Sequence, residues 1–325
     1  MTNSKTIGLT GATGHLGNNV LLHLIKLGYT VKSLYRSSLP VTEHPNLTWI
    51  KGDLKNEASI DTLVQNTTTV IHCAAVISIG NISSEKVLDI NVNGTEKIIE
   101  KCLKHNSKLI YISSTNAVAE SSENEVFNEN RPYKTNADFV YGHSKALAEQ
   151  AIVTAIKKEG LDAIILRPSA IVGPPDHIPS HFGNAILDFA NGKFPFLTSG
   201  GYNIVDVRDV TRTIINSITL GKSGEVYLVT GAYMSIFDIA QLANPTNKFK
   251  RISLDLLIML LPIIALIKRV FKFDWPISKE SLITLNYGPK VMDDSKAVRL
   301  LKHKIRPTEE TINDLINWFK TTNKL

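Results

Sequence analysis

Apolar and polar residues follow one another in a regular order along the first 170 residues. Short runs rich in Ile, Val and Leu predict buried strands, and longer stretches with a 3.6-residue period predict amphipathic helices. Strands and helices that alternate in this way form a parallel sheet covered by helices on both faces. The pattern predicts strands at 5–10, 30–35, 47–50, 69–73, 108–113 and 162–167, and helices at 15–27, 57–64, 84–105 and 141–158.

The pattern becomes less regular after residue 170, and five prolines lie between residues 168 and 195. Proline does not fit inside helices or central strands, so these positions predict turns and short elements. The polar stretch 120–138 has no clear period and leads into Tyr141, so we expect it to border a ligand. The remaining periodic runs predict helices at 182–192 and 209–220 and strands near 202–206 and 224–230.

Three glycines with a spacing of three residues separate the first predicted strand from the first predicted helix. Glycines there permit a tight turn, close approach of the backbone to a pyrophosphate, and close packing of the helix on the strand. The free amides and the dipole of the helix start supply an anion site. The strand before and the helix after therefore indicate dinucleotide binding. The predicted cofactor-binding residues in this turn are Gly11, Thr13, Gly14, His15, Leu16 and Gly17.

Tyr141 and Lys145 lie four residues apart at the start of a predicted helix. This spacing places both side chains on one face of the helix. A phenol has an ordinary pKa of about 10, and a neighbouring ammonium lowers that pKa because opposite charge favours the phenolate. The pair is therefore suited to proton transfer near neutral pH.

Together, the glycine turn and the Tyr141/Lys145 pair resemble the extended branch of the short-chain dehydrogenase/reductase superfamily, the NAD-dependent epimerase/dehydratase family. The resemblance covers residues 5 to about 320. It is closest to the dihydroflavonol 4-reductase and 3β-hydroxysteroid dehydrogenase neighbourhood, to which segments 31–36 and 294–318 are similar. The other matching segments are 70–75 (VIHCAA), 91–95 (NVNGT), 111–118 (YISSTNAV), 167–169 (RPS), 173–174 (GP) and 203–210 (NIVDVRDV).

The resemblance implies a Rossmann fold, a doubly wound parallel α/β sheet, for an NADP(H)-binding domain at residues 1–170. It implies a smaller, discontinuous substrate-binding region at residues 171–325, with parts that return to the sheet. Asp206 and Asp209 are expected to hold this region against the sheet, and a role in the chemistry is the alternative.

The resemblance also implies the catalytic residues. Tyr141 is the general acid/base, and Lys145 lowers the pKa of its phenol and binds the nicotinamide ribose. Thr115 matches the position of the catalytic hydroxyl, which orients the oxygen of the substrate. Ser114 is the alternative, although strand alternation turns its side chain away.

Further cofactor contacts follow from the same resemblance. Asp53, with Leu54, matches the acceptor for the adenine amine, and Pro168 and Ser169 match a turn near the nicotinamide. Asn91 supports the lysine through backbone and water contacts, or else makes only local hydrogen bonds. His72 lines the cofactor cradle beside Ala74 and Ala75, whose small side chains admit the dinucleotide.

Arg36 bears on the choice of coenzyme. NAD sites place a carboxylate at the end of the second strand, whereas an arginine accommodates the 2′-phosphate of NADP. No carboxylate occurs between Arg36 and Glu43. The sequence therefore predicts NADP(H), and a surface arginine in an NAD enzyme is the alternative.

Composition excludes several other classes. The chain has 325 residues, of which 43% are apolar and 20% charged, as in an ordinary globular protein. The net charge of +6 is dispersed and forms no basic stripe, so we expect no nucleic-acid partner. The two cysteines, Cys73 and Cys102, give no disulfide framework or metal-ligand spacing. With no apolar secretory run at the N-terminus, we expect a cytoplasmic protein without a metal site.

Residues 256–267 are nearly all apolar, and Lys268, Arg269 and Lys272 follow them. Pro262 interrupts the run, and crossing a bilayer core requires about twenty residues. The segment therefore predicts a buried helix over the substrate pocket, a peripheral membrane contact with its cations at anionic headgroups, or a dimer contact.

A homodimer through the predicted helices 84–105 and 141–158 is a further expectation. Small residues on the second helix permit close approach of a partner, but they equally suit packing on the sheet. These residues are Ala146, Ala148, Ala151 and Ala155.

The sequence thus predicts an NADP(H)-dependent reductase or dehydrogenase that interconverts a ketone and a secondary alcohol on an apolar small molecule. One alternative is a nucleotide-sugar epimerase or dehydratase, which uses the same residues with a bound and recycled NAD. The other is a non-catalytic dinucleotide-binding sensor, although such a protein has no need of both Tyr141 and Lys145.

Overall fold

The computed structural model describes residues 5–78, 82–121, 125–194, 196–271 and 279–325. Its centre is a parallel sheet of seven strands in the order β10-β6-β5-β4-β1-β2-β3. The strand order reverses between β1 and β4, which confirms the predicted doubly wound sheet and places its switch point at these two strands. The strands are β1 (Thr6–Thr10), β2 (Thr30–Tyr35), β3 (Leu47–Lys51), β4 (Thr69–His72), β5 (Lys108–Ile112), β6 (Ala163–Pro168) and β10 (Val226–Val229).

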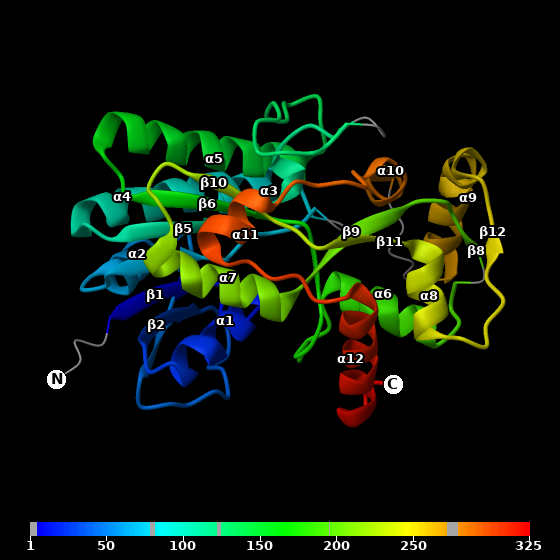
Figure 1. The fold of residues 1–325 in the computed structure, drawn as a ribbon, viewed down its shortest axis with the longest axis horizontal. Coiled ribbons are helices and arrows are strands. Elements are labelled where there is room, and N and C mark those ends of the chain that lie inside the picture. The colour runs from blue at the N-terminus through cyan, green and yellow to red at the C-terminus, as the bar shows by residue number, and fades with distance from the viewer. Residues whose placement is uncertain (1–4, 79–81, 122–124, 195, 272–278) are drawn as a thin grey trace.

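Helices cover both faces of this sheet (Figure 1). One apolar cluster lies between the sheet and α1 (His15–Lys26), α7 (Val207–Leu220) and α11 (Ser295–Leu301). The other lies between the opposite face and α2 (Glu57–Val64), α4 (Gly94–His105) and α5 (Val140–Glu159). Consecutive strand residues, such as Ile110 and Tyr111, enter opposite clusters.

The helix predicted at 84–105 is divided into three parts. A short helix, α3 (Ser84–Leu88), leads into one π-helical turn, η1 (Asp89–Asn93), before α4 begins. Such π-turns are uncommon and often occur at functional sites. The apolar period alone does not reveal this turn, because it changes the helix geometry over only five residues.

A second group of elements lies beside the large sheet (Figure 1). Its core contains Phe189, Ile239, Ile312 and Phe319, all at most 4% exposed. The group comprises β7 (Ala170–Val172), β9 (Gly201–Asp206) and β11 (Ala232–Ser235) in one sheet, with α6 (His181–Ala190), α8 (Ile236–Ala243) and α12 (Thr308–Thr321). The remaining elements are η2 (Thr115–Ala117), β8 (Phe196–Leu197), β12 (Lys250–Arg251), α9 (Leu254–Phe271) and α10 (Lys279–Tyr287).

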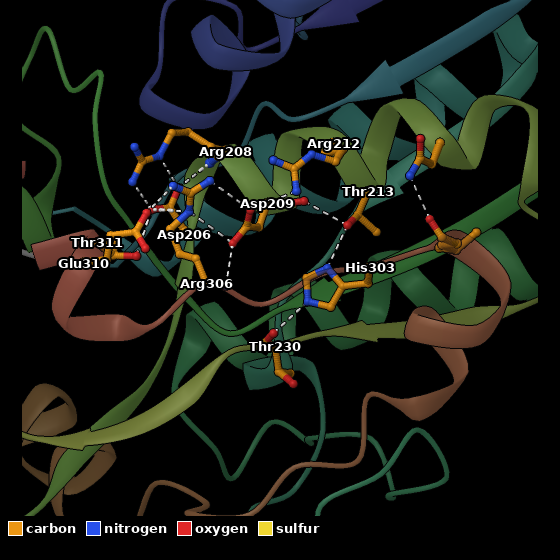
Figure 2. A network of polar contacts seen from close by, with 12 residues as sticks. Asp206, Arg208, Asp209, Arg212, Thr213, Thr230, His303, Arg306, Glu310 and Thr311 are labelled. Carbon is orange, nitrogen blue, oxygen red and sulfur yellow. Dashed lines mark hydrogen bonds and ion pairs between the residues drawn. The ribbon is translucent and has the colours of Figure 1, made fainter. Parts of the chain in front are cut away.

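An ion-pair network joins the start of α7 to the segment before α12 (Figure 2). The Asp206 carboxylate accepts hydrogen bonds from the Arg208 backbone amide at 2.7 Å and from the Thr311 hydroxyl at 2.8 Å. Arg306 contacts both Asp206 and Asp209 at 3.3 Å. Both carboxylates therefore hold the segment around the start of α12 against α7, which is the structural role expected from the sequence.

Candidate active site

The glycine turn has the shape of a dinucleotide cradle. Gly11 has a φ of 75°, and a Cβ there would lie 2.7 Å from the Ala74 amide nitrogen. A Cβ on Gly17 would lie 2.1 Å from the Gly11 carbonyl oxygen, so the helix packs directly on the turn. Gly14 begins α1 without a side-chain cap, and no acidic residue occupies the first turn. The helix start therefore fits a bound pyrophosphate.

His15 and Asn19 connect this cradle to the loop after β7. His15 Nε2 lies 2.7 Å from the Gly173 carbonyl oxygen. The Asn19 side chain donates a hydrogen bond to the Pro175 carbonyl oxygen at 3.0 Å. Thr13 is exposed and Leu16 half-buried. Sequence reasoning missed Asn19 because its partner lies 156 positions away.

His72 is buried at the end of β4 between two threonines. Its Nδ1 lies 2.6 Å from the Thr10 hydroxyl and its Nε2 lies 3.2 Å from the Thr95 hydroxyl. The Thr10 hydroxyl also accepts a hydrogen bond from the Ala74 amide at 3.2 Å. Burial lowers the pKa of His72 to about 3. The neutral ring therefore fixes the strand end, next to half-buried Ala74 and exposed Ala75.

Acidification is expected to destabilise the protein through His72. Between about pH 3 and pH 6.5 the unfolded chain binds a proton here that the folded protein does not bind, so stability falls as the pH falls. The expected slope is about 1.4 kcal/mol per pH unit from this group. Urea unfolding at pH 6.5 and 4.5 measures it, and His72→Gln is expected to show the shallower dependence. Equal slopes in the two proteins contradict the prediction.

The residues predicted for the adenosine half gather at the ends of β2 and β3. Arg36 and Asp53 line one shallow pocket, together with Lys51, Gly52 and Asn56. One carboxylate oxygen of Asp53 accepts the Lys55 amide at 2.9 Å. Leu54 is buried and lies against Gly94, where a Cβ would meet it at 3.0 Å.

Tyr141 and Lys145 both lie on α5, as predicted. Lys145 is 2% exposed, and its Nζ donates a hydrogen bond to the Ile112 carbonyl oxygen at 2.7 Å. Burial lowers the pKa of Lys145 to about 8, against the opposing effect of Glu149. Tyr141 is half-buried near the start of the helix.

Gly142 brings the start of α5 against the turn that contains Thr115. A Cβ on Gly142 would lie 2.5 Å from the Asn116 carbonyl oxygen. This close approach places the segment of Tyr141 beside η2. Sequence reasoning passed over Gly142, although glycine within a helix is a signal of close backbone packing.

Ser114 and Thr115 have different surroundings. The Ser114 hydroxyl accepts a hydrogen bond from the Asn116 amide at 3.1 Å and so caps η2. Thr115 is half-buried, and its hydroxyl makes no hydrogen bond with the part of the chain that the structure describes. The Ser114 hydroxyl is thus engaged in the turn, and the role of Thr115 toward a ligand stays a proposal.

Asn91 lies in the π-helical turn and contacts two segments of the site. Its carboxamide exchanges hydrogen bonds with the backbone of Val76 at 2.8 and 2.9 Å. The amide nitrogen also donates to the Ser144 hydroxyl at 2.9 Å, and that hydroxyl donates to the Tyr141 carbonyl oxygen at 2.7 Å. Asn91 thus links the segment after β4 to the helix of Tyr141, and Ser144 is a link that the sequence analysis missed.

The end of β6 carries a buried ion pair that the sequence analysis also missed. Arg167 donates to both carboxylate oxygens of Glu149, at 2.6 Å for the shortest contact, and both residues are at most 2% exposed. Arg167 also donates to the Glu129 carbonyl oxygen at 2.9 Å. It therefore ties the polar segment 125–134 to the sheet. Pro168 and Ser169 follow and are buried.

The apolar segment 256–267 lies in α9, which contains Pro262. Leu257 is 8% exposed, whereas Leu256, Met259 and Ile263 are 42%, 66% and 55% exposed. Within the described ranges, no helix has the length and apolar character that crossing a membrane requires. The same residues contain no cluster of three His, Cys, Asp or Glu side chains able to hold a metal ion.

Comparison with known proteins decides the family. The model of the NAD-dependent epimerase/dehydratase family matches residues 7–230. The chain belongs to this family. As a member of it, the protein is an NAD(P)-dependent enzyme of the extended short-chain dehydrogenase/reductase type, which confirms that prediction from the sequence.

Individual relatives of this epimerase/dehydratase family member match it over about half of its length or over nearly all of it. It is 31% identical to sterol demethylase protein B of Methylococcus capsulatus over 96% of this chain and 97% of that protein. It is 27% identical to the 3-beta-hydroxysteroid dehydrogenase of Mycolicibacterium neoaurum over 52% of this chain and 48% of that protein. The crystal structure of gox2253 matches with a TM-score of 0.82 and 27% identity, over 99% of this chain and all of that one.

Proposed function

We propose that this family member is an NADP(H)-dependent reductase or dehydrogenase that interconverts a ketone and a secondary alcohol. The observation that carries the proposal is the buried Lys145, which lies on the same helix as Tyr141. Its ammonium donates a hydrogen bond to the Ile112 carbonyl oxygen on β5. A cation at this position favours the phenolate of Tyr141. Proton transfer at a carbinol oxygen requires this arrangement, and a protein that only bound a dinucleotide would not.

NADPH, held by the glycine turn and Lys145, would supply the hydride for the carbonyl carbon in the proposed reduction. The Tyr141 hydroxyl donates its proton to the oxygen that becomes the alkoxide, and the Thr115 hydroxyl donates a hydrogen bond to the same oxygen. Lys145 offsets the negative charge left on the phenolate. Oxidation of the alcohol is the reverse, with the Tyr141 phenolate accepting the hydroxyl proton.

We propose an apolar, ring-containing substrate, which is bound between the sheet edge and residues 171–325. The names of the sterol and steroid relatives support this class. The family name keeps the epimerase as a second candidate. Denaturing the purified protein and identifying the released dinucleotide separates the two. Stoichiometric NAD supports an epimerase, whereas an empty protein that then binds NADPH supports the reductase.

Arg36→Ala is expected to raise the KM for NADPH about tenfold and to leave the KM for NADH nearly unchanged. The reason is that Arg36 lines the pocket at the strand ends and is the residue proposed to bind the 2′-phosphate. Lys32→Ala is the control, because Lys32 lies on β2, which ends just before Arg36, and donates to the Thr62 and Gln65 carbonyls instead. Equal changes for both coenzymes rule out the assignment.

We propose that the exposed stripe of α9 contacts an anionic lipid surface. Leu256, Met259 and Ile263 form this stripe, and the exposed cations Lys250 and Arg251 immediately precede the helix. Apolar residues beside cations suit the boundary between headgroups and acyl chains.

Met259→Ser is expected to reduce sedimentation with phosphatidylglycerol vesicles several-fold. Val41→Ser is the control, since Val41 is 98% exposed and lies elsewhere on the surface. Equal vesicle binding of the two variants argues against the lipid contact. If Met259→Ser changes the KM for substrate and the protein does not bind vesicles, α9 covers the substrate pocket instead.

The homodimer stays a proposal, which sedimentation equilibrium tests. Ala146, Ala148 and Ala155 are at most 2% exposed within one chain and Ala151 is half-buried, so of these four residues only Ala151 offers surface to a partner.

A further inference from the structure

The Lys145 ammonium is buried with little hydrogen bonding to balance its charge. Its Nζ donates to Ile112, and the side chain is 2% exposed. Burying a charge is costly unless another group stabilises it. Glu149 lies one turn farther along α5 and raises the pKa of Lys145, but its carboxylate also forms the ion pair with Arg167. Burial still lowers the pKa of Lys145 overall, so a further group that favours the cation is of interest here.

Tyr111 presents the face of its ring to this ammonium. Lys145 Nζ lies 4.5 Å from the ring centroid, and Tyr111 is 1% exposed. The face of an aromatic ring carries partial negative charge and attracts a cation within about 6 Å, most strongly when both groups are out of water. Ile112, the next residue on β5, accepts the hydrogen bond, so one strand supplies both contacts.

We propose that Tyr111 is a positioning residue for Lys145, and that its ring face holds the ammonium in place and keeps it cationic beside Tyr141. The importance of that charge for turnover rests on the proposed function, whereas the contact itself does not. The role goes to the ring rather than to the hydroxyl of Tyr111, because the ring centroid is the point that faces the cation.

The other titratable groups around Lys145 do not replace the ring. His72 and Cys73 face it from the end of β4, and burial lowers the pKa of His72 to about 3 and raises that of Cys73 to about 12. Both are therefore neutral near pH 7. On α5, Tyr141 is the group that Lys145 serves, and Glu149 favours the cation from a distance while its carboxylate pairs with Arg167.

The test measures the pKa of Lys145 directly, in protein without coenzyme or substrate. The ¹³Cε resonance in lysine-labelled protein reports it, and Lys145→Met assigns the signal. Tyr111→Phe keeps the ring and is expected to leave the pKa unchanged. Tyr111→Leu removes the ring and is expected to lower the pKa by about one unit, a tenfold larger acid dissociation constant. Ile110→Val is the control, because Ile110 packs on the opposite face of the same strand.

A second series keeps the shape of the side chain. Phenylalanines with one, two and three fluorines at position 111 weaken the negative ring face step by step. The pKa of Lys145 is expected to fall with each fluorine, and this result holds even where Tyr111→Leu does not fold. A pKa that is independent of the fluorines, or a Tyr111→Phe protein that shifts as far as Tyr111→Leu, overturns the proposal.

Failure of the function and failure of this inference give different results. If the Lys145 pKa shifts stepwise in the Tyr111 series but Tyr141→Phe turns over at the wild-type rate, the role of Tyr111 is supported. The same result excludes the acid/base role proposed for Tyr141. Lost turnover in Tyr141→Phe with no shift in the Tyr111 series does the opposite.

Discussion

Tyr141→Phe is expected to lower kcat by about 10² to 10⁴-fold, the usual contribution of a general acid or base. The ring still fills its place on α5, but no proton reaches the substrate oxygen. The affinity for NADPH is expected to remain within twofold, because the glycine turn and Lys145 are unchanged. Stopped-flow reduction of a panel of apolar ketones, with coenzyme titration by fluorescence, measures both quantities.

Tyr29→Phe is the matched control for this experiment. Tyr29 precedes β2 and packs against the core cluster beside α1. The Tyr29→Phe variant also loses a phenol hydroxyl, but outside the candidate active site, so full activity is expected. A Tyr141→Phe enzyme as active as this control excludes the proposed acid/base role.

Glu149→Gln is expected to lower the free energy of unfolding by about 3–5 kcal/mol, because it leaves the Arg167 charge buried without a counter-charge. The Arg167 contact with the Glu129 carbonyl is weakened as well, which loosens the segment before Tyr141. Urea unfolding followed by circular dichroism measures the change.

Two further variants interpret that result. The double replacement Glu149→Leu with Arg167→Met is expected to recover most of the lost stability, since no unpaired charge remains. Lys104→Ala breaks the exposed pair with Asp61 and is expected to change stability by less than about 1 kcal/mol. A Glu149→Gln loss no larger than that of Lys104→Ala refutes the prediction.

The seven strands of the large sheet and its helices α1, α2, α5 and α7 were predictable because their apolar periods are local, whereas the short helix α11 was not predicted. The division of the 84–105 helix at Asn91 was not predictable from the sequence. The π-turn accompanies hydrogen bonds from the Asn91 side chain to Val76 and Ser144, which belong to other segments. The exposed side of α9 was equally hidden. A run of apolar residues in a sequence does not show which of their side chains are exposed to solvent.

The site shows the same division. Glycine spacing and the Tyr141/Lys145 spacing are patterns along the chain, so the sequence predicts them. The Arg167 pair with Glu149, the contact of Gly142 with Asn116, and the ring of Tyr111 beneath Lys145 join different segments. Such contacts require the coordinates, because residue type alone does not select a partner.

The place of β10 at the edge of the large sheet bears on how the chain is made by the ribosome. This strand pairs with β6, yet it ends at residue 229. The core beside α1 also requires Ile214 from α7 and Leu301 from α11. A nascent chain that has emerged only to residue 170 therefore carries an open strand edge and an uncovered apolar face, both of which promote aggregation. Cutting the gene at that point is expected to give inclusion bodies rather than a free coenzyme-binding module.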